Sequence, residues 1–155
     1  MQPVSSNIRT FYNIVRESIE LMNASIESGK RPKPNGEPGW IITYDPEQKS
    51  FKAALIAITF SGIYLEALLH LLIVEKHGIE LYKKIDRKSY EDKLELLRCT
   101  PLIKEECKYY RDMRRDIVHE KAHFDAGKIY WAQEDAVRAF NFINSVNAYF
   151  KIHIS

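Results

Sequence analysis

The hydrophobic residues of this chain recur mostly at the spacing of α-helices. Between residues 6 and 28, apolar side chains return every three or four positions and build one apolar stripe. The stripe consists of Ile8, Phe11, Tyr12, Val15, Ile19, Met22 and Ile26. Ser5, Ser6 or Asn7 can cap the start of this segment, and Gly29 ends it. The pattern predicts an amphipathic first helix over 6–28.

The next helical segment is apolar on nearly every side. Asp45 and Pro46 are typical of a cap followed by a first-turn proline, and the segment extends to about His77, just before Gly78. A helix that is apolar all round lies at the centre of a bundle or partly within an oligomer. Gly62 lies inside it, where glycine costs about 1 kcal/mol relative to alanine. We therefore expect a central helix that another helix crosses closely at Gly62.

The remaining segments predict further helices and an irregular excursion. Residues 30–39 contain three prolines and two glycines, which argues against regular structure there, and residues 40–44 either form a short strand or pack back on the core. A polar linker is expected over 83–88, with helices at 89–98 (capped by Ser89), from Pro101 through Val118, and at about 133–151. The prediction is a single all-α domain over residues 1–155, a four- or five-helix up-and-down bundle with a long central apolar helix.

Composition and charge narrow the functional classes. With 155 residues, 45% of them hydrophobic, the chain is long enough to bury a core, and its net charge of +2 requires any RNA contact to depend on a local patch. Cys99 and Cys107 lack CxxC spacing and are expected to be free thiols in a reducing cytosol. No export signal is recognisable, and Glu66 and His70 interrupt the longest apolar stretch. We expect a cytoplasmic protein without a membrane span.

The candidate chemistry lies in the run Arg-Arg-Asp-Ile-Val-His at 114–119. Histidine titrates near neutral pH, so His119 could remove or deliver a proton. An arginine offers a planar, permanently charged fork that suits a phosphate or a phosphorane. Together they could support attack of an RNA 2′-hydroxyl on the neighbouring phosphate without a metal. On a straight helix Arg115 shares a face with His119, whereas Arg114 lies about 140° away.

A wider cationic ridge is expected around this run. Arg111, Arg115 and His119 fall on one helical face, and Tyr109 or Tyr110 would lie beside them to stack an RNA base. These residues are the expected substrate-binding groups. The simpler interpretation is a solvated helix end, where arginine and histidine interact favourably with the helix dipole.

The run and its context resemble the HEPN family (higher eukaryote and prokaryote nucleotide-binding domains). It lies on the penultimate major helix of a small bundle, after an apolar helix reading Tyr-Leu-Glu-Ala-Leu-Leu at 64–69. The resemblance covers most of the chain in helix order. It implies a helical bundle, commonly a homodimer whose two motifs meet at the interface. Many members are metal-independent endoribonucleases of toxin–antitoxin, phage-defence or RNA-processing systems, and others are inactive binding modules.

The resemblance assigns roles by position. Arg114 matches the motif arginine, His119 the motif histidine, and Glu66 an acidic residue that some members bring from the second helix. Arg115 departs from the Asn, Asp or His that usually follows the motif arginine, and Lys121 stands where one toxin branch has tyrosine. The expected function is cleavage of RNA with no cofactor and no metal, by a homodimer, with an antitoxin protein as a further expected partner. The alternative is a catalytically silent dimeric binding module.

A second motif shares the same histidine. Residues 119–123 read His-Glu-Lys-Ala-His, a literal HExxH, in which two histidines bind zinc and the glutamate acts as a base. Lys121 stands at a position that zinc proteases usually keep uncharged, and Glu134 is close for a third ligand. A zinc protease is therefore the remote alternative.

Overall fold

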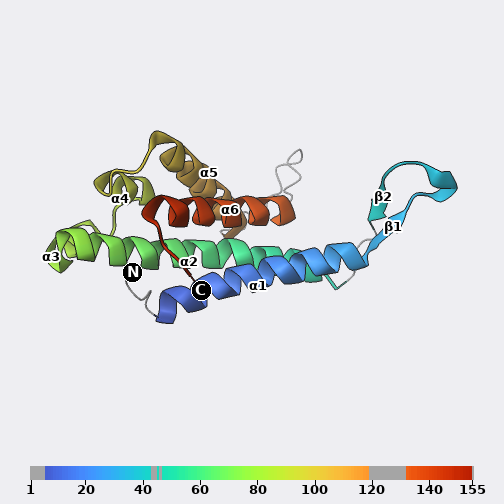
Figure 1. Cartoon of the computed structure of the whole chain (residues 1–155), viewed down its shortest axis with the longest axis horizontal. Coiled ribbons are helices and arrows are strands. Elements are labelled where there is room, and N and C mark those ends of the chain that lie inside the picture. The colour runs from blue at the N-terminus through green and yellow to red at the C-terminus, as the bar shows by residue number, and fades with distance from the viewer. Residues whose placement is uncertain (1–5, 43–44, 46, 119–131, 155) are drawn as a thin grey trace.

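The computed structural model of the chain describes residues 6–42, 45, 47–118 and 132–154, and it confirms the all-α class. Six α-helices and one two-stranded sheet make up this part of the chain (Figure 1). The helices are α1 (Ser6–Ser28), α2 (Lys49–His77), α3 (Ile79–Ile85), α4 (Tyr90–Leu96), α5 (Pro101–Val118) and α6 (Ala132–Phe150). The strands are β1 (Lys30–Pro32) and β2 (Trp40–Ile42), with a 3-10 turn, η1 (Pro34–Gly36), between them.

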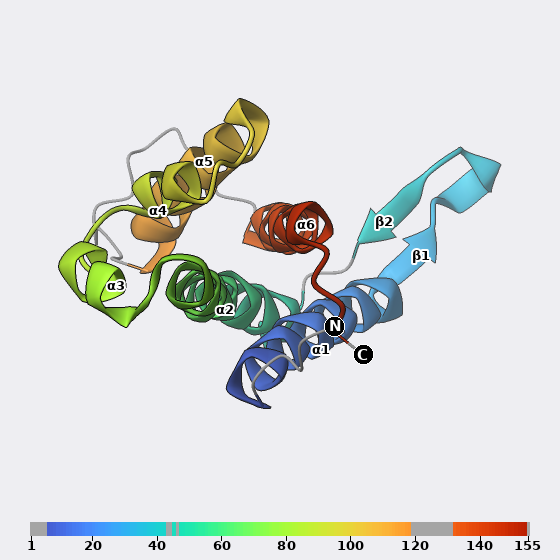
Figure 2. The same cartoon turned by 60° about the vertical axis from the view of Figure 1, so that its left-hand side comes forward.

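Helix α2 is the centre of the bundle. It packs against α1 on one side and against α6 on another, while α5 packs on α6 and α4 bridges α5 and α2 (Figures 1 and 2). Within the described residues, α2 is also the one helix long and apolar enough to cross a membrane. Half of that apolar stretch is buried within the protein, as expected for the central helix of a bundle.

Helix boundaries follow the sequence pattern closely, with one exception. The first helix spans the predicted residues, and Ser89 caps α4 in a reciprocal capping box with Asp92. The predicted start of the central helix at Asp45 is wrong, because Gln48 adopts a left-handed conformation (φ 55°) and α2 begins only at Lys49. The Asp45 carboxylate still accepts backbone N–H bonds, at 3.1 Å from Glu47 and 3.0 Å from Ser50.

Two segments are more regular than the sequence predicts. The excursion after α1 forms an antiparallel hairpin in which Pro32 lies opposite Trp40. Its prolines fall at positions where no ladder hydrogen bond is required, so they restrict the turn without preventing strand pairing. Part of the predicted polar linker belongs to α3, a seven-residue helix. The four long helices α1, α2, α5 and α6 form the bundle, and the short α3 and α4 cover one end.

The predicted close crossing at Gly62 is confirmed. The Tyr110 hydroxyl on α5 donates a hydrogen bond to the Ile58 carbonyl of α2 at 2.7 Å. A Cβ atom on Gly62 would lie 2.7 Å from the Tyr110 hydroxyl oxygen and 2.8 Å from Arg114 Nε. The missing side chain therefore makes room for two side chains of α5.

The Gly62→Ala substitution tests this crossing. Alanine favours a helix over glycine by about 1 kcal/mol, yet the added methyl must displace Tyr110 and Arg114, and overpacking costs about 1–3 kcal/mol. We expect the free energy of unfolding, measured by urea denaturation, to fall. The loss should be smaller in a Tyr110→Phe background, where the nearest contact is absent. A stabilised Gly62→Ala protein would contradict the close crossing.

Candidate functional site

A cleft of about 370 Å³ opens on the side of α2 that faces α3, α4 and α5. The wall that α2 contributes is one face of that helix, because Gly62, Glu66 and His70 follow one another at intervals of four residues. Side chains from five helices line it: Phe11 (α1), Gly62, Ile63, Glu66, Ala67 and His70 (α2), Tyr82 (α3), Tyr90 (α4) and Arg114 (α5). The cleft therefore gathers a carboxylate, a guanidinium, an imidazole and two phenols from segments far apart in the sequence.

Arg114 contributes a guanidinium with an unused donor. Its side chain is half-buried beside Gly62, and its Nε atom is buried with no hydrogen-bond partner among the described residues. Buried polar groups nearly always have a partner, so an unpaired Nε at the cleft wall marks Arg114 as a candidate functional residue. Burial raises the pKa of Tyr90, and the positive charge of Arg114 opposes that rise.

Glu66 is held in place by two neighbours. Its Oε1 atom accepts hydrogen bonds from Lys93 Nζ at 2.5 Å and from the Tyr82 hydroxyl at 3.1 Å. Lys93 is 1% exposed, and its Nζ also lies 5.5 Å from the centre of the Tyr82 ring. The His70 ring stacks on the Tyr82 ring at the rim of the cleft, with 4.2 Å between the two ring centres. The carboxylate is therefore fixed on the cleft wall.

The charges of the cleft come from basic and acidic side chains together. Lys93 and Glu66 neutralise each other as an ion pair. Burial raises the pKa of Tyr82, and the nearby carboxylates of Asp86 and Glu66 raise it further. Arg114 is the lining residue that suits a phosphate, because its planar guanidinium matches the phosphate oxygens.

The structure brings together two of the three predicted catalytic residues. Arg114 and Glu66 line the same cleft. His119 lies outside the described residues. The Arg115 side chain is instead 61% exposed and lies 3.6 Å from both Asp112 and Asp116. The geometry thus selects Arg114, rather than Arg115, as the arginine that faces the cleft.

The two described arginines of the predicted cationic ridge, Arg111 and Arg115, pair with neighbouring carboxylates. Arg111 NH1 lies 2.5 Å from Glu91, and Arg111 NH2 lies 3.3 Å from Asp112. Arg115 approaches Asp112 as well. Acidic residues interleaved on and beside α5 therefore neutralise both of these arginines.

The two predicted base-stacking tyrosines differ in their positions. Tyr110 is 1% exposed, stacks on Phe142 in the core and holds α2, so its predicted contact with a base is wrong for this structure. Tyr109 is 39% exposed, but Arg138 covers its ring at 3.3 Å and its hydroxyl donates to Asp135 at 3.1 Å. Neither ring offers an open face beside Arg114.

Sequence reasoning missed Lys93, Tyr90 and Tyr82. A signal was present for Lys93, because Tyr90, Leu94 and Leu97 repeat at helical spacing and Lys93 falls on the same apolar face. A lysine on a buried face requires a negative partner. Tyr82 carried no such signal, since it falls between Gly78 and the polar linker expected over 83–88, where no element was predicted.

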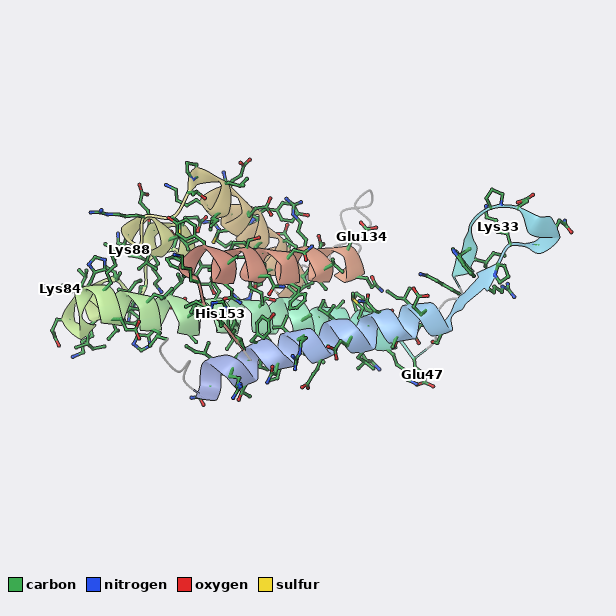
Figure 3. The ribbon with its side chains drawn as sticks, viewed as in Figure 1. Lys33, Glu47, Lys84, Lys88, Glu134 and His153 are labelled. Carbon is green, nitrogen blue, oxygen red and sulfur yellow. The ribbon has the colours of Figure 1, made fainter. Side chains whose placement is uncertain are left out.

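The zinc alternative receives no support from the described residues, and both cysteines are buried free thiols. The predicted zinc ligands at 119–123 lie outside them, and Glu134 is exposed in the first turn of α6 (Figure 3). No group of three or more His, Cys, Asp or Glu side chains in the described ranges could hold a metal ion. Burial raises the pKa of Cys99 to about 11 and raises that of Cys107 further, so both thiols stay protonated at neutral pH.

Comparisons of the chain with models of known protein families, with curated proteins and with solved structures each gave no match. The resemblance to HEPN proteins consequently depends on the residues quoted above. The functional inference that follows depends on the chemistry of the cleft.

The buried ion pair between Lys93 and Glu66 predicts which of two single substitutions lowers the free energy of unfolding more. Glu66→Gln leaves the fully buried Lys93 without a counter-charge, and breaking a buried pair in this way costs about 3–5 kcal/mol. Lys93→Met leaves only a partly exposed carboxylate that water can solvate, so we expect a smaller loss of unfolding free energy. The double variant should recover part of the loss of Glu66→Gln. Chemical denaturation of the four proteins measures this, and equal losses for the two single variants would argue against the pairing.

Proposed function

We propose that this chain is a metal-independent endoribonuclease of the HEPN type. The observation that carries the proposal is the position of Arg114. Its guanidinium lines the cleft and has a buried Nε with no hydrogen-bond partner among the described residues. It also lies on the helix whose described part ends at Val118, one residue before His119.

The proposed chemistry divides between these residues. His119 accepts the proton of a ribose 2′-hydroxyl as its oxygen attacks the adjacent phosphorus. The P–O5′ bond then breaks, leaving a 2′,3′-cyclic phosphate and a 5′-hydroxyl that receives a proton. Arg114 stabilises the negative charge that develops on the phosphoryl oxygens. Glu66, fixed by Lys93 and Tyr82, is the carboxylate available to orient the imidazole.

The wider biological proposal is a cytoplasmic homodimer acting as a toxin or phage-defence effector, with RNA as substrate and an antitoxin protein as a further partner. Exposed apolar side chains support an association of two copies through α2. Phe51 and Ile56 on this helix are 40% and 43% exposed. Five residues apart, they lie about 140° apart around α2, so they offer two separate apolar contacts rather than one patch.

A silent binding module is the second candidate, and one observation favours it. Glu66 is already engaged by Lys93 and Tyr82, and Arg111 and Arg115 by neighbouring carboxylates. These contacts serve stability without any catalysis. In that case the Arg114 cleft binds an anionic ligand but transforms nothing.

An RNA cleavage assay separates the two candidates. The purified chain should cut total RNA in the presence of EDTA. His119→Ala should lower the rate about 10²–10⁴-fold, as expected for loss of an acid–base group. Arg114→Ala should lower it about 10²–10³-fold, as expected for loss of a charge-stabilising donor.

Arg115→Ala is the matched control, because it removes an arginine next in sequence that faces solvent. Its rate should stay close to that of the unmodified chain. Intact RNA after incubation with the purified chain, or an Arg115→Ala loss equal to that of Arg114→Ala, would overturn the proposed function. Cleavage abolished by EDTA would point to metal chemistry instead.

A further inference from the structure

The β1–β2 hairpin stands away from the helical bundle. Figures 1 and 2 show it extending beyond the C-terminal end of α1, on the side opposite α3. Every residue from 31 to 40 is exposed. The hairpin therefore adds no core to the fold, although it is an ordered pair of strands with a defined register.

The hairpin carries the whole charge imbalance of the chain. Residues 30–42 contain Lys30, Arg31 and Lys33 but only one acidic residue, Glu37. Removing these from the 23 basic and 21 acidic residues of the chain leaves 20 of each sign. The charges of the rest of the protein sum to zero, and the hairpin is a local basic patch of the kind that an RNA contact requires.

The basic side chains at the outer part of the hairpin are not neutralised. Lys30 pairs with Glu27 at the end of α1. Arg31 and Lys33, by contrast, have no ion-pair partner in the part of the chain that the structure describes. The Lys33 side chain lies across Gly39, whose ideal Cβ position is 3.5 Å from Lys33 Cε.

Trp40 exposes an aromatic surface on the same hairpin as these cations. Its side chain is 62% exposed, unusually high for the largest apolar residue type. The strand register places Trp40 opposite Pro32 and Ile41 opposite Arg31. Trp40 and Arg31 thus belong to opposite faces of the two-stranded ribbon, with Lys33 at its tip.

The hairpin is restrained before any partner binds. Prolines at 32, 34 and 38 fix their own backbone φ angles. Asn35, Gly36 and Gly39 close the turn with φ of 63°, 72° and 107°, values that asparagine and glycine tolerate best. A restrained arm loses little conformational entropy when it docks, which favours a binding role.

We propose that the β1–β2 hairpin is a docking arm for single-stranded RNA. Trp40 stacks on an unpaired base, and Arg31 and Lys33 contact phosphates of the same strand, the combination that single-strand binders use. An unpaired strand is inferred because bases within a duplex do not present their faces to a tryptophan. The choice of RNA rests on the proposed function, whereas the arm itself lies apart from the Arg114 cleft.

Fluorescence anisotropy with a labelled 20-nucleotide oligo(U) tests the arm. The full chain carries His119→Ala throughout, so that binding is measured without cleavage. Trp40→Ala should weaken binding on the order of ten-fold. Arg31→Gln with Lys33→Gln should lower the slope of log affinity against log salt by about 1.4, at about 0.7 for each lost phosphate contact. Trp40→Phe should retain most of the affinity, because it keeps a stacking ring.

The matched control is Lys84→Gln with Lys88→Gln. These lysines are exposed, have no ion-pair partner among the described residues and lie at the other end of the molecule from Lys33 (Figure 3). This double variant lowers the net charge by two, as the hairpin double variant does. It should leave the slope of log affinity against log salt nearly unchanged. An equal fall of the salt slope in this control would overturn the docking-arm proposal. Unchanged affinity in both Trp40→Ala and the Arg31→Gln with Lys33→Gln variant would overturn it as well. Unchanged RNA affinity with a hairpin-dependent dimer in sedimentation would assign the hairpin to protein contact instead.

The failure of this inference is distinct from the failure of the proposed function. A chain that binds oligo(U) through the hairpin but never cuts RNA supports the arm and contradicts the nuclease. A chain that cuts RNA, with binding indifferent to Trp40, Arg31 and Lys33, supports the nuclease and contradicts the arm.

Discussion

The contact between α2 and α5 at Gly62 determines where the chemistry of this molecule lies. Because Gly62 has no side chain, Tyr110 reaches the Ile58 carbonyl and anchors α5 on α2. The next turn of α5 then places the Arg114 guanidinium over the same gap. A larger residue at Gly62 would close this space, and Arg114 would lose its position at the cleft.

The buried pair of Lys93 and Glu66 complements that contact. Charges are rarely buried unless paired, and here each member satisfies the other while Tyr82 donates a further hydrogen bond. The pair ties α4 and α2 together at the cleft and cancels its own charge. Arg114 lines the cleft without forming an ion pair with a described carboxylate, which is why the proposed ligand is an anion.

The sequence predicted the parts of this architecture that depend on local rules. Helical periodicity, the Ser89 cap and the unusual glycine at 62 each have a local signature, and each corresponds to an observed feature. The pairing of the hairpin strands was missed because a stretch with three prolines resembles an irregular loop.

For the candidate site, sequence reasoning found residue types but not their surroundings. It placed Arg114 and Glu66 in one functional group, and they do line one cleft. It assigned Tyr110 to base stacking, because periodicity on a single helix does not show which face a neighbouring helix covers. The Glu91 carboxylate opposite Arg111 depends on α4 packing against α5, a tertiary contact with no signature in the local sequence.

The central claim is that Arg114, rather than its neighbour Arg115, binds the phosphate of an RNA strand. NMR of the arginine Nε–Hε groups tests it most directly, using an RNA with 2′-O-methyl groups that cannot be cleaved, in the presence of EDTA. The Arg114 signal, assigned by its loss in Arg114→Lys, should shift and saturate as RNA is added, while the Arg115 signal changes little. An Arg114 signal that stays fixed while RNA binds would contradict the account.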